Sequence, residues 1–231
     1  MARRVGAAGS VVRYHLAMAS TLDDPRVRRA LDEMHAAADR NDPPLLASAR
    51  GKSGAERAAL LGDAFIPVSA DAGRWLYVLA RGAAPGLVVE FGTSFGISTI
   101  YLAAALRDRG GGRVITTELH EGKAARARDY IAAAGLTDLV DLRVGDALKT
   151  VGDVSAGVSV LFLDGWKDLY LPFLRTIERA LLPGALVIGD DLDLFPDALR
   201  GYLAYVRDPA NGYVSVTLPV GDAMEVSVRA R

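Results

Sequence analysis

A glycine-rich turn carries the first groups in the sequence that can bind a ligand. Residues 90–98 read EFGTSFGIS, and they connect an apolar, strand-like run to a helix-like stretch. Turns of this kind present backbone N–H groups to a ligand at the edge of an α/β sheet. The spacing Glu-x-Gly-x-x-x-Gly matches neither the dinucleotide motif nor the phosphate loop, so an NAD-dependent oxidoreductase is disfavoured. An ordinary tight turn between a strand and a helix also accounts for these glycines.

Acidic residues stand at the ends of the next two strand-like runs. Glu118 ends the second run, roughly 20 or more residues beyond the glycine turn, where an acid can accept hydrogen bonds from both hydroxyls of a ribose. The third run ends in Val144-Gly145-Asp146-Ala147. A solvated carboxylate or a helix cap explains Glu118 in isolation, and a helix cap explains Asp146. Chance produces two such acids at consecutive strand ends less readily than one.

Together these features resemble the cofactor motifs of class I S-adenosylmethionine-dependent methyltransferases. In that class the glycines let the backbone approach the amino-acid part of the cofactor, and the acid of the first strand serves its ammonium group. The resemblance also implies ribose binding by Glu118 and adenine-side contacts from the Gly-Asp turn. The cofactor residues that it implies are Val68, Glu90, Gly92, Ser94, Gly96, Ser98, Glu118, Gly145, Asp146, Ala147, Asp164 and Trp166.

The segment at the end of the fourth strand-like run makes the resemblance more specific, because it points to one family within this class. Residues 161–172 read LFLDGWKDLYLP, a pattern similar to that of catechol O-methyltransferase and its bacterial relatives. In that family the aspartate binds a divalent cation, the tryptophan packs near the adenine, and the lysine is the general base. These residues correspond here to Asp164, Trp166 and Lys167. The fifth run ends in Asp190-Asp191, where the family carries two further metal ligands.

Carboxylates that meet at neighbouring strand ends have a physical reason to hold a cation. Asp164, Asp190 and Asp191 would repel one another and raise each other's pKa unless a cation compensated them. Their hard oxygen atoms favour magnesium, calcium or manganese over zinc. Such an ion can bind both oxygens of a vicinal diol while Lys167 accepts the hydroxyl proton. The alternatives are a helix cap at Asp190-Asp191, a solvated Lys167 and a core position for Trp166.

Alternating apolar runs and Ala-rich helical stretches have to position these residues. Continuous apolar runs predict strands that are buried on both faces of a parallel sheet, at 87–91, 113–118, 140–144, 158–163 and 185–189. The helical stretches between them lie at 97–109, 123–134, 146–151, which is ambiguous, and 170–182, and one reading of Asp190-Asp191 adds a helix at 195–207. Alternating residues at 213–218 and 224–229 predict a terminal antiparallel hairpin.

The amino-terminal part has a helical pattern. Helices are predicted at 24–40, where Asn41-Asp42-Pro43-Pro44 stops the pattern, at 55–61, and at 69–81, where Ser69 or Asp71 can cap the helix. The predicted fold class is α/β, a Rossmann-like doubly wound seven-stranded sheet, mostly parallel, plus N-terminal helices. We expect one methyltransferase domain over 1–231, with a helical section at 1–65 and the core at 66–231.

Composition excludes several other classes of protein. The chain has 231 residues, of which 51% are hydrophobic, so it can bury a sizeable core, and it has no cysteine for disulfides, iron–sulfur clusters or thiolate zinc sites. Its formal charge of -1 provides no broad cationic field. Arg13 and His15 interrupt the apolar stretch near the amino end, which argues against a secretion signal. We expect a soluble, cytoplasmic protein.

The expected function is S-adenosylmethionine-dependent, cation-assisted O-methylation of a small hydroxylated acceptor, most simply an aromatic vicinal diol. The resemblance also implies magnesium and a homodimer with the amino-terminal helices at its interface. It does not identify the substrate, because the family's best-known member has a glutamate in the last hairpin and 215–218 contains no acid. One alternative is a tRNA hydroxyuridine O-methyltransferase, and another is an inactive S-adenosylmethionine-binding protein. A basic face for tRNA would come from Arg3, Arg4, Arg13, Arg26, Arg28 and Arg29.

Overall fold

A seven-stranded sheet forms the centre of the computed structural model, which describes residues 20–49, 52, 60–194 and 196–230. The strand order is β3-β2-β1-β4-β5-β7-β6. Strands β1 to β5 run parallel, and β7 pairs antiparallel with both β5 and β6. The strands are β1 (Leu87–Phe91), β2 (Val114–Glu118), β3 (Val140–Val144), β4 (Val158–Leu163), β5 (Leu181–Gly189), β6 (Tyr213–Leu218) and β7 (Met224–Arg229). This topology confirms the predicted fold class.

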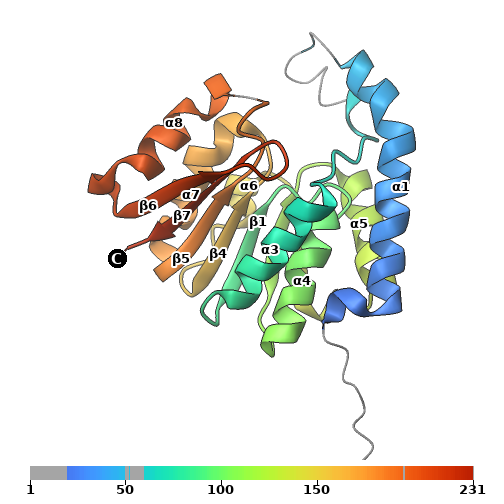
Figure 1. The fold of residues 1–231 in the computed structure, drawn as a ribbon, viewed down its shortest axis with the longest axis horizontal. Helices are drawn as coiled ribbons and strands as arrows, with labels where there is room; N and C mark the ends of the chain where they lie inside the picture. The colour runs from blue at the N-terminus through green and yellow to red at the C-terminus, as the bar shows by residue number, and fades with distance from the viewer. Residues whose placement is uncertain (1–19, 50–51, 53–59, 195, 231) are drawn as a thin grey trace, which may run out of the picture.

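Helices cover both faces of the sheet (Figure 1). One face packs against α1 (Pro25–Ser48), α3 (Ala70–Gly82), α4 (Ile97–Arg109) and α5 (Glu121–Ala133). The other packs against α6 (Ala147–Thr150), α7 (Tyr170–Ile177) and α8 (Pro196–Arg207). Short 3-10 turns occur at Thr21–Asp23, Thr137–Leu139, Lys167–Leu169, Glu178–Ala180 and Pro209–Asn211. The predicted helix at 55–61 lies almost entirely outside the described residues.

Burial on both faces explains the continuous apolar runs. In β4 all the side chains are buried: Val160 and Phe162 join the core under α3 and α4, while Leu161 and Leu163 join the core under α7 and α8. Successive side chains of a strand point to opposite faces, so a strand covered on both sides is apolar at most positions. The exception in β4 is buried Ser159, whose hydroxyl donates to Leu87 O at 3.2 Å. Because β1 to β5 are parallel, their carboxyl ends meet at one edge of the sheet.

The first long helix continues past the point where the sequence pattern predicts its end. The prediction that residues 41–44 stop the helix is wrong, because α1 extends to Ser48 with Pro43 and Pro44 inside it. Each proline removes a helical N–H donor, which normally disfavours this arrangement. Buried Asp42, however, accepts hydrogen bonds from the N–H groups of Phe65 and Ile66, at 2.8 and 2.7 Å. Tertiary contacts therefore hold this part of the helix in place.

The fifth strand begins earlier than predicted. Leu181 and Leu182, expected at the end of a helix, belong to β5, and α7 ends at Ile177. Leu181 pairs with Val158 of β4, and the register then shifts before Leu186 pairs with Val160. The exposed Pro183-Gly184 pair occupies this irregularity, with Gly184 at φ +78°. Pairing with β4 thus decides the conformation of an apolar pair that fits either element. Other boundaries differ from prediction by one or two residues.

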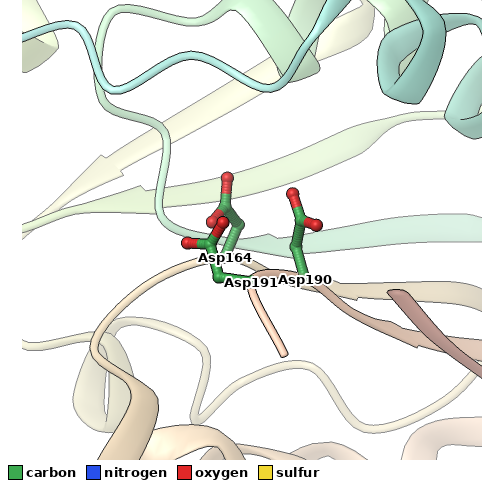
Figure 2. A group of neighbouring side chains, drawn as sticks. All are labelled: Asp164, Asp190 and Asp191. Atoms are coloured by element: carbon green, nitrogen blue, oxygen red, sulfur yellow. The ribbon is translucent and has the colours of Figure 1, made fainter. Parts of the chain in front are cut away.

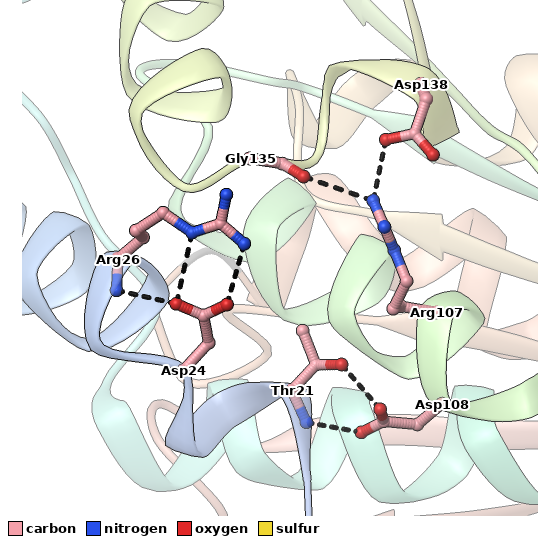
Figure 3. A network of polar contacts seen from close by, with 7 residues as sticks. All are labelled: Thr21, Asp24, Arg26, Arg107, Asp108, Gly135 and Asp138. Carbon is pink, nitrogen blue, oxygen red and sulfur yellow. Dashed lines mark hydrogen bonds and ion pairs between the residues drawn. The ribbon is translucent and has the colours of Figure 1, made fainter. Parts of the chain in front are cut away.

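Polar contacts fasten the 3-10 turn before α1 to the end of α4, and the end of α4 to the residues after α5 (Figure 3). Asp24 caps α1 through the N–H of Arg26 and also accepts from its guanidinium. The Asp108 carboxylate at the end of α4 accepts from the N–H and hydroxyl of Thr21, at 2.7 and 2.5 Å. Arg107 donates to Gly135 O at 3.1 Å and to Asp138 at 2.6 Å. The turn that leads into α1 is therefore fixed to α4, and α4 is fixed to the segment that follows α5. Over the part of the chain that is described, no helix has the length and apolar character needed to cross a bilayer.

Candidate active site

Carboxylates from the ends of two strands come together at the carboxyl edge of the sheet. Asp164 follows β4, and Asp190 and Asp191 follow the adjacent strand β5. One carboxylate oxygen from each lies within 4.8 Å of those of the other two. Figure 2 shows the side chains standing next to one another at these strand ends. The structure therefore brings the predicted metal ligands into one cluster, which we call the carboxylate cluster.

Backbone geometry explains how consecutive residues can face the same cluster. The N–H of Asp190 donates to Leu163 O at 3.0 Å, which continues the hydrogen-bond ladder of the sheet. Asp191 has φ +61°, in the left-handed region that non-glycine residues seldom adopt. This conformation breaks the alternation of side chains along the strand. Both carboxylates consequently join Asp164, and α8 begins only at Pro196.

Lys167 is held against the carboxylate cluster. Its Nζ lies 2.7 Å from Asp191 Oδ2 and 3.2 Å from Asp164 Oδ1, and it donates to the Tyr170 hydroxyl at 2.9 Å. The Tyr170 hydroxyl in turn donates to the backbone oxygen of Asp190 at 3.3 Å. The Lys167 side chain is 10% exposed, so the alternative of a solvated lysine is wrong.

Burial and mutual repulsion dominate the electrostatics of the carboxylate cluster. Burial, together with the charges of Asp190 and Asp191, raises the pKa of Asp164 well above its usual range, although Lys167 opposes this. Burial and the charge of Asp191 likewise raise the pKa of Asp190 to about 7. Burial alone would lower the pKa of Lys167, but the carboxylates of Asp164 and Asp191 outweigh it and raise that pKa. Close packing thus makes the negative charges costly unless a cation lies among them.

The glycine turn lies beside this cluster, at the end of β1. Gly92 has φ +101°, and a Cβ there would come within 2.7 Å of Asp164 O. Only glycine therefore allows the turn to approach the end of β4 so closely. Gly96, at φ +93°, stands at the amino end of α4, where free N–H groups are available for an anionic group. Ser94 also has a positive φ, of +47°.

Glu90 lies behind the turn and is completely buried. Thr99 donates a hydrogen bond to Glu90 Oε2 at 2.5 Å, while Oε1 has no partner among the described residues. Burial raises the pKa of Glu90 above its usual value. Ser98 is buried in the first turn of α4. A buried carboxylate oxygen without a partner suits an additional hydrogen-bond donor.

Glu118 and Asp146 make local hydrogen bonds at the ends of β2 and β3. Glu118 accepts from the N–H groups of Ser94 and His120, both at 2.8 Å. Asp146 caps α6 by accepting from the N–H of Leu148 at 3.1 Å, and it follows Gly145, at φ +129°. The cap expected as an alternative for Asp146 is thus present. Glu118 links the glycine turn to the end of β2.

The remaining predicted cofactor residues occupy different environments. Trp166 is 43% exposed beside Asp164, so a core position for it is wrong. Val68 is buried just before α3, and Ala147 begins α6. Sequence reasoning missed Tyr170 as a partner of Lys167, and it missed Asp42 and Lys123, which bind the backbone of residues 64–66. The scarcity of lysine, four among 27 basic residues, was the available signal for Lys123.

Comparisons with known proteins agree with this geometry. A family model described as a methyltransferase domain matches residues 89–192, from β1 to the carboxylate cluster. The catechol O-methyltransferase of Sus scrofa is 34% identical over 131 residues, which cover 53% of this chain and 68% of that protein. The chain belongs to the catechol O-methyltransferase family. The resemblance to class I S-adenosylmethionine-dependent O-methyltransferases is thereby confirmed.

Further relatives define the extent of the similarity. The catechol O-methyltransferase of Niastella koreensis is 34% identical over 131 residues, which cover 55% of this chain but only 58% of that protein. The O-methyltransferase TomG from Streptomyces achromogenes, solved in complex with S-adenosylmethionine, covers 87% of this chain and 90% of its own, with 26% identity and a TM-score of 0.66. Similarity to these proteins therefore supports the fold and the position of the site at the edge of the sheet. The activity of this protein has to be argued from its own residues.

The last hairpin differs from the pattern expected of the family. Ser215 and Thr217 of β6 both donate to Glu225 of β7, at 2.6 Å. Glu225 is fully buried and also accepts from Arg207 at 2.8 Å. This acid is therefore occupied by contacts within the hairpin and with α8. It does not join the carboxylate cluster.

Proposed function

We propose that this protein is a divalent-cation-assisted O-methyltransferase that uses S-adenosylmethionine to methylate one hydroxyl of a small aromatic vicinal diol. The observation that carries the proposal is the carboxylate cluster at the edge beside the glycine turn, with Lys167 in contact with two of its members. Membership of the catechol O-methyltransferase family supports the same reaction class.

The carboxylate cluster fits a divalent cation. Asp164, Asp190 and Asp191 supply hard oxygen ligands whose negative charges are insufficiently compensated by Lys167 alone. This donor set favours magnesium. A cation bound there supplies Lewis-acid chemistry, because it lowers the pKa of a coordinated hydroxyl and orients its oxygen.

Lys167 is the proposed general base. Its raised pKa makes it an ammonium group, which is held by Asp164 and Asp191. The same carboxylates would serve the cation, so its charge would offset their effect and lower the pKa of Lys167. The ammonium group could then lose a proton to solvent, and the neutral amine could accept the hydroxyl proton. With S-adenosylmethionine bound, the deprotonated oxygen would form a bond to the methyl carbon while the bond from that carbon to the sulfonium sulfur breaks, which would give the methyl ether and S-adenosylhomocysteine. Tyr170 keeps the Lys167 Nζ in reach through its hydroxyl.

The cofactor residues fit S-adenosylmethionine. The free Oε1 of buried Glu90 suits the ammonium group of the amino-acid part, and Ser98 with the amino end of α4 suits its carboxylate. Gly92, Ser94, Gly96 and Val68 would line the approach to that part. Glu118 would accept from the ribose hydroxyls, while Gly145, Asp146, Ala147 and Trp166 would surround the adenine. S-adenosylmethionine supplies the methyl group as an electrophile.

The test of the reaction is methyl transfer to a panel of aromatic vicinal diols, with magnesium and with EDTA. We expect turnover that requires magnesium and falls by at least about 100-fold in Lys167→Met, because a general base contributes roughly that factor or more. Arg200→Met on α8 is the matched control, since its side chain is 78% exposed, and it should retain turnover within about twofold.

Each other outcome has a definite meaning. Turnover that persists in EDTA would contradict the proposed requirement for a divalent cation. Cofactor binding without turnover on any diol would move the proposal to a larger or RNA acceptor. Absence of cofactor binding would overturn the proposed function as a whole.

Cation binding can be measured without an acceptor. Magnesium should raise the melting temperature of the wild-type protein in a concentration-dependent way, because a ligand that binds only the folded state stabilises it. Asp164→Asn removes one ligand charge and should abolish this shift, whereas Asp197→Asn on the exposed face of α8 should preserve it. An equal shift in both variants would argue against the carboxylate cluster as the site.

We also propose that the protein forms a homodimer, which the family resemblance supports. Sedimentation velocity over a range of concentrations should give a species of about twice the chain mass of 24.4 kDa. A monomer at every concentration would contradict this proposal.

A further inference from the structure

The backbone segment 64–68, from Ala64 to Val68, is fastened to the glycine turn and to α1. Asp42 of α1 accepts from the N–H groups of Phe65 and Ile66. The Ser94 hydroxyl in the glycine turn donates to Phe65 O at 2.8 Å. The rings of Phe65 and Phe95 are in contact, with centroids 4.3 Å apart. Separate elements therefore hold the segment that runs into Val68.

The conformation of this segment needs such support. Ile66 has φ +44°, in the left-handed region where a β-branched residue is strained. Its side chain is 42% exposed, so packing of that side chain does little to fix the backbone. Strained residues persist where surrounding contacts determine their conformation, and they cluster at functional sites. The hydrogen bonds at Phe65 and at the N–H of Ile66 itself provide this constraint.

Lys123 adds an anchor from α5. Its Nζ donates to Ala64 O at 2.8 Å and approaches Ser94 Oγ at 3.4 Å. It also lies 5.4 Å from the centre of the Phe95 ring. Among the described residues, no carboxylate forms an ion pair with this ammonium group within 4.0 Å. Its partners are therefore the backbone of the segment and the serine of the turn.

The position of Lys123 is costly for a cation. Burial lowers its pKa, although the more distant carboxylates of Glu118, Asp42 and Asp63 oppose this. A lysine on an exposed helix face would avoid the cost, and Arg128 on the same helix has such a position. What Lys123 gains is a charged hydrogen bond to Ala64 O, which is stronger than a neutral one.

We propose that Lys123 is a positioning residue that holds the 64–68 segment against the glycine turn and thereby completes the S-adenosylmethionine site. The inference rests on the proposed function for the identity of the ligand. Ser94 connects the parts: its hydroxyl binds Phe65 O and lies near Lys123, and its N–H binds Glu118, the proposed ribose ligand. Val68, at the end of the segment, and Glu118 are thus tied to the same turn. Lys123 itself does not touch the reacting atoms.

The test compares Lys123→Met with Arg128→Met, a matched loss of positive charge on the exposed side of α5. Calorimetry measures binding of S-adenosylhomocysteine, and hydrogen exchange measures opening of residues 64–68 in the free protein. Lys123→Met should weaken binding roughly tenfold, the effect of one lost charged hydrogen bond, and should speed exchange in this segment. Arg128→Met should change neither quantity by more than about twofold.

A second anchor separates positioning from general destabilisation. Asp42→Asn acts on the same segment from α1, so its effect on binding should not add to that of Lys123→Met in the double variant. Melting temperatures identify any variant that fails to fold, in which case the other anchor carries the test.

Wild-type affinity in Lys123→Met together with unchanged exchange would overturn the inference. If the wild-type protein itself does not bind S-adenosylhomocysteine, the proposed function fails. The exchange comparison then decides the anchoring: faster exchange in Lys123→Met supports the anchor, and equal exchange refutes it.

Discussion

Glu90 combines a buried charge with an unused hydrogen-bond acceptor. Its side chain is inaccessible to solvent, Oε1 lacks a partner among the described residues, and burial raises its pKa. A carboxylate in this state destabilises the folded protein when it is ionised. A cationic group of a cofactor would remove that penalty. Ionised Glu90 therefore destabilises the free protein, and a cationic ligand that compensates its charge gains binding free energy.

Replacement of Glu90 by Gln should separate the effect of its charge on protein stability from its effect on ligand binding. Because the folded-state pKa is raised, the wild-type protein loses stability as pH rises from about 4.3 through the folded pKa. Glu90→Gln has no charge to ionise, so its free energy of unfolding should exceed that of wild type at pH 8 by about 1–3 kcal/mol. The difference should disappear near pH 4. Urea unfolding across this pH range measures it.

The same variant should bind S-adenosylhomocysteine at least about tenfold more weakly, because the neutral amide attracts an ammonium group less than a carboxylate does. Glu121→Gln, an exposed position at the start of α5, is the control for both measurements. A variant that is less stable than wild type at pH 8 would show that the ionised Glu90 is compensated in the free protein.

At the scale of elements, α1 lies along the outside of the fold and is attached to it near both of its ends. The turn that precedes it is tied to α4 through Asp108, and its later part is tied to the segment before α3 through Asp42. Arg26, near its beginning, lies against Gly135, where a Cβ would approach the guanidinium within 2.7 Å. Helices gain most of their stability from such tertiary contacts rather than from intrinsic propensity. This explains how α1 continues through Pro43 and Pro44.

Loss of the Asp108 contacts should weaken the attachment of the turn before α1 to α4. Asp108 accepts from Thr21 and from the Tyr77 hydroxyl, at 2.5 to 2.7 Å. Asp108→Ala should lower the free energy of unfolding by about 1–3 kcal/mol, because donors that are partly buried lose their acceptor. Asp138→Ala removes a carboxylate that is 67% exposed and should cost less than about 1 kcal/mol. Similar losses in both variants would refute the special role of Asp108.

At the scale of the whole molecule, charge balance distinguishes the competing substrate classes. The chain carries 27 basic and 28 acidic residues, so it has no net attraction for a polyanion. Many of the arginines are neutralised locally, as in the pairs Arg143–Asp153 and Arg107–Asp138. A small acceptor needs no long-range field, whereas a transfer RNA usually does.

Binding of transfer RNA should consequently be weak. In a filter-binding assay at about 50 mM salt we expect no retention of tRNA at micromolar protein, and no steep dependence on salt. Tight retention that is lost as salt rises would instead support the tRNA hydroxyuridine methyltransferase alternative. In that case the diol assay should show no turnover.

The sequence by itself determined the fold class and most element boundaries. Runs such as 158–163 are apolar at all positions but Ser159 because both faces of β4 are covered, and this requirement is local enough to read from the pattern. The glycine turn could also be predicted from local sequence, because the positive φ of Gly92 and Gly96 restricts the residue type at those positions. Asp164 and Lys167 were identified from the resemblance of residues 161–172 to the catechol O-methyltransferase pattern.

Only the tertiary structure decided which distant groups meet. Adjacent β4 and β5 bring Asp164 to Asp190 and Asp191, although the left-handed backbone of Asp191 has no sequence signature. The helix break expected at Pro43-Pro44 was overridden through Asp42. Lys123 binds the backbone of Ala64, 59 residues away. Periodicity reports how each segment divides its surface between core and solvent, but hydrogen bonds between distant residues depend on how the segments dock.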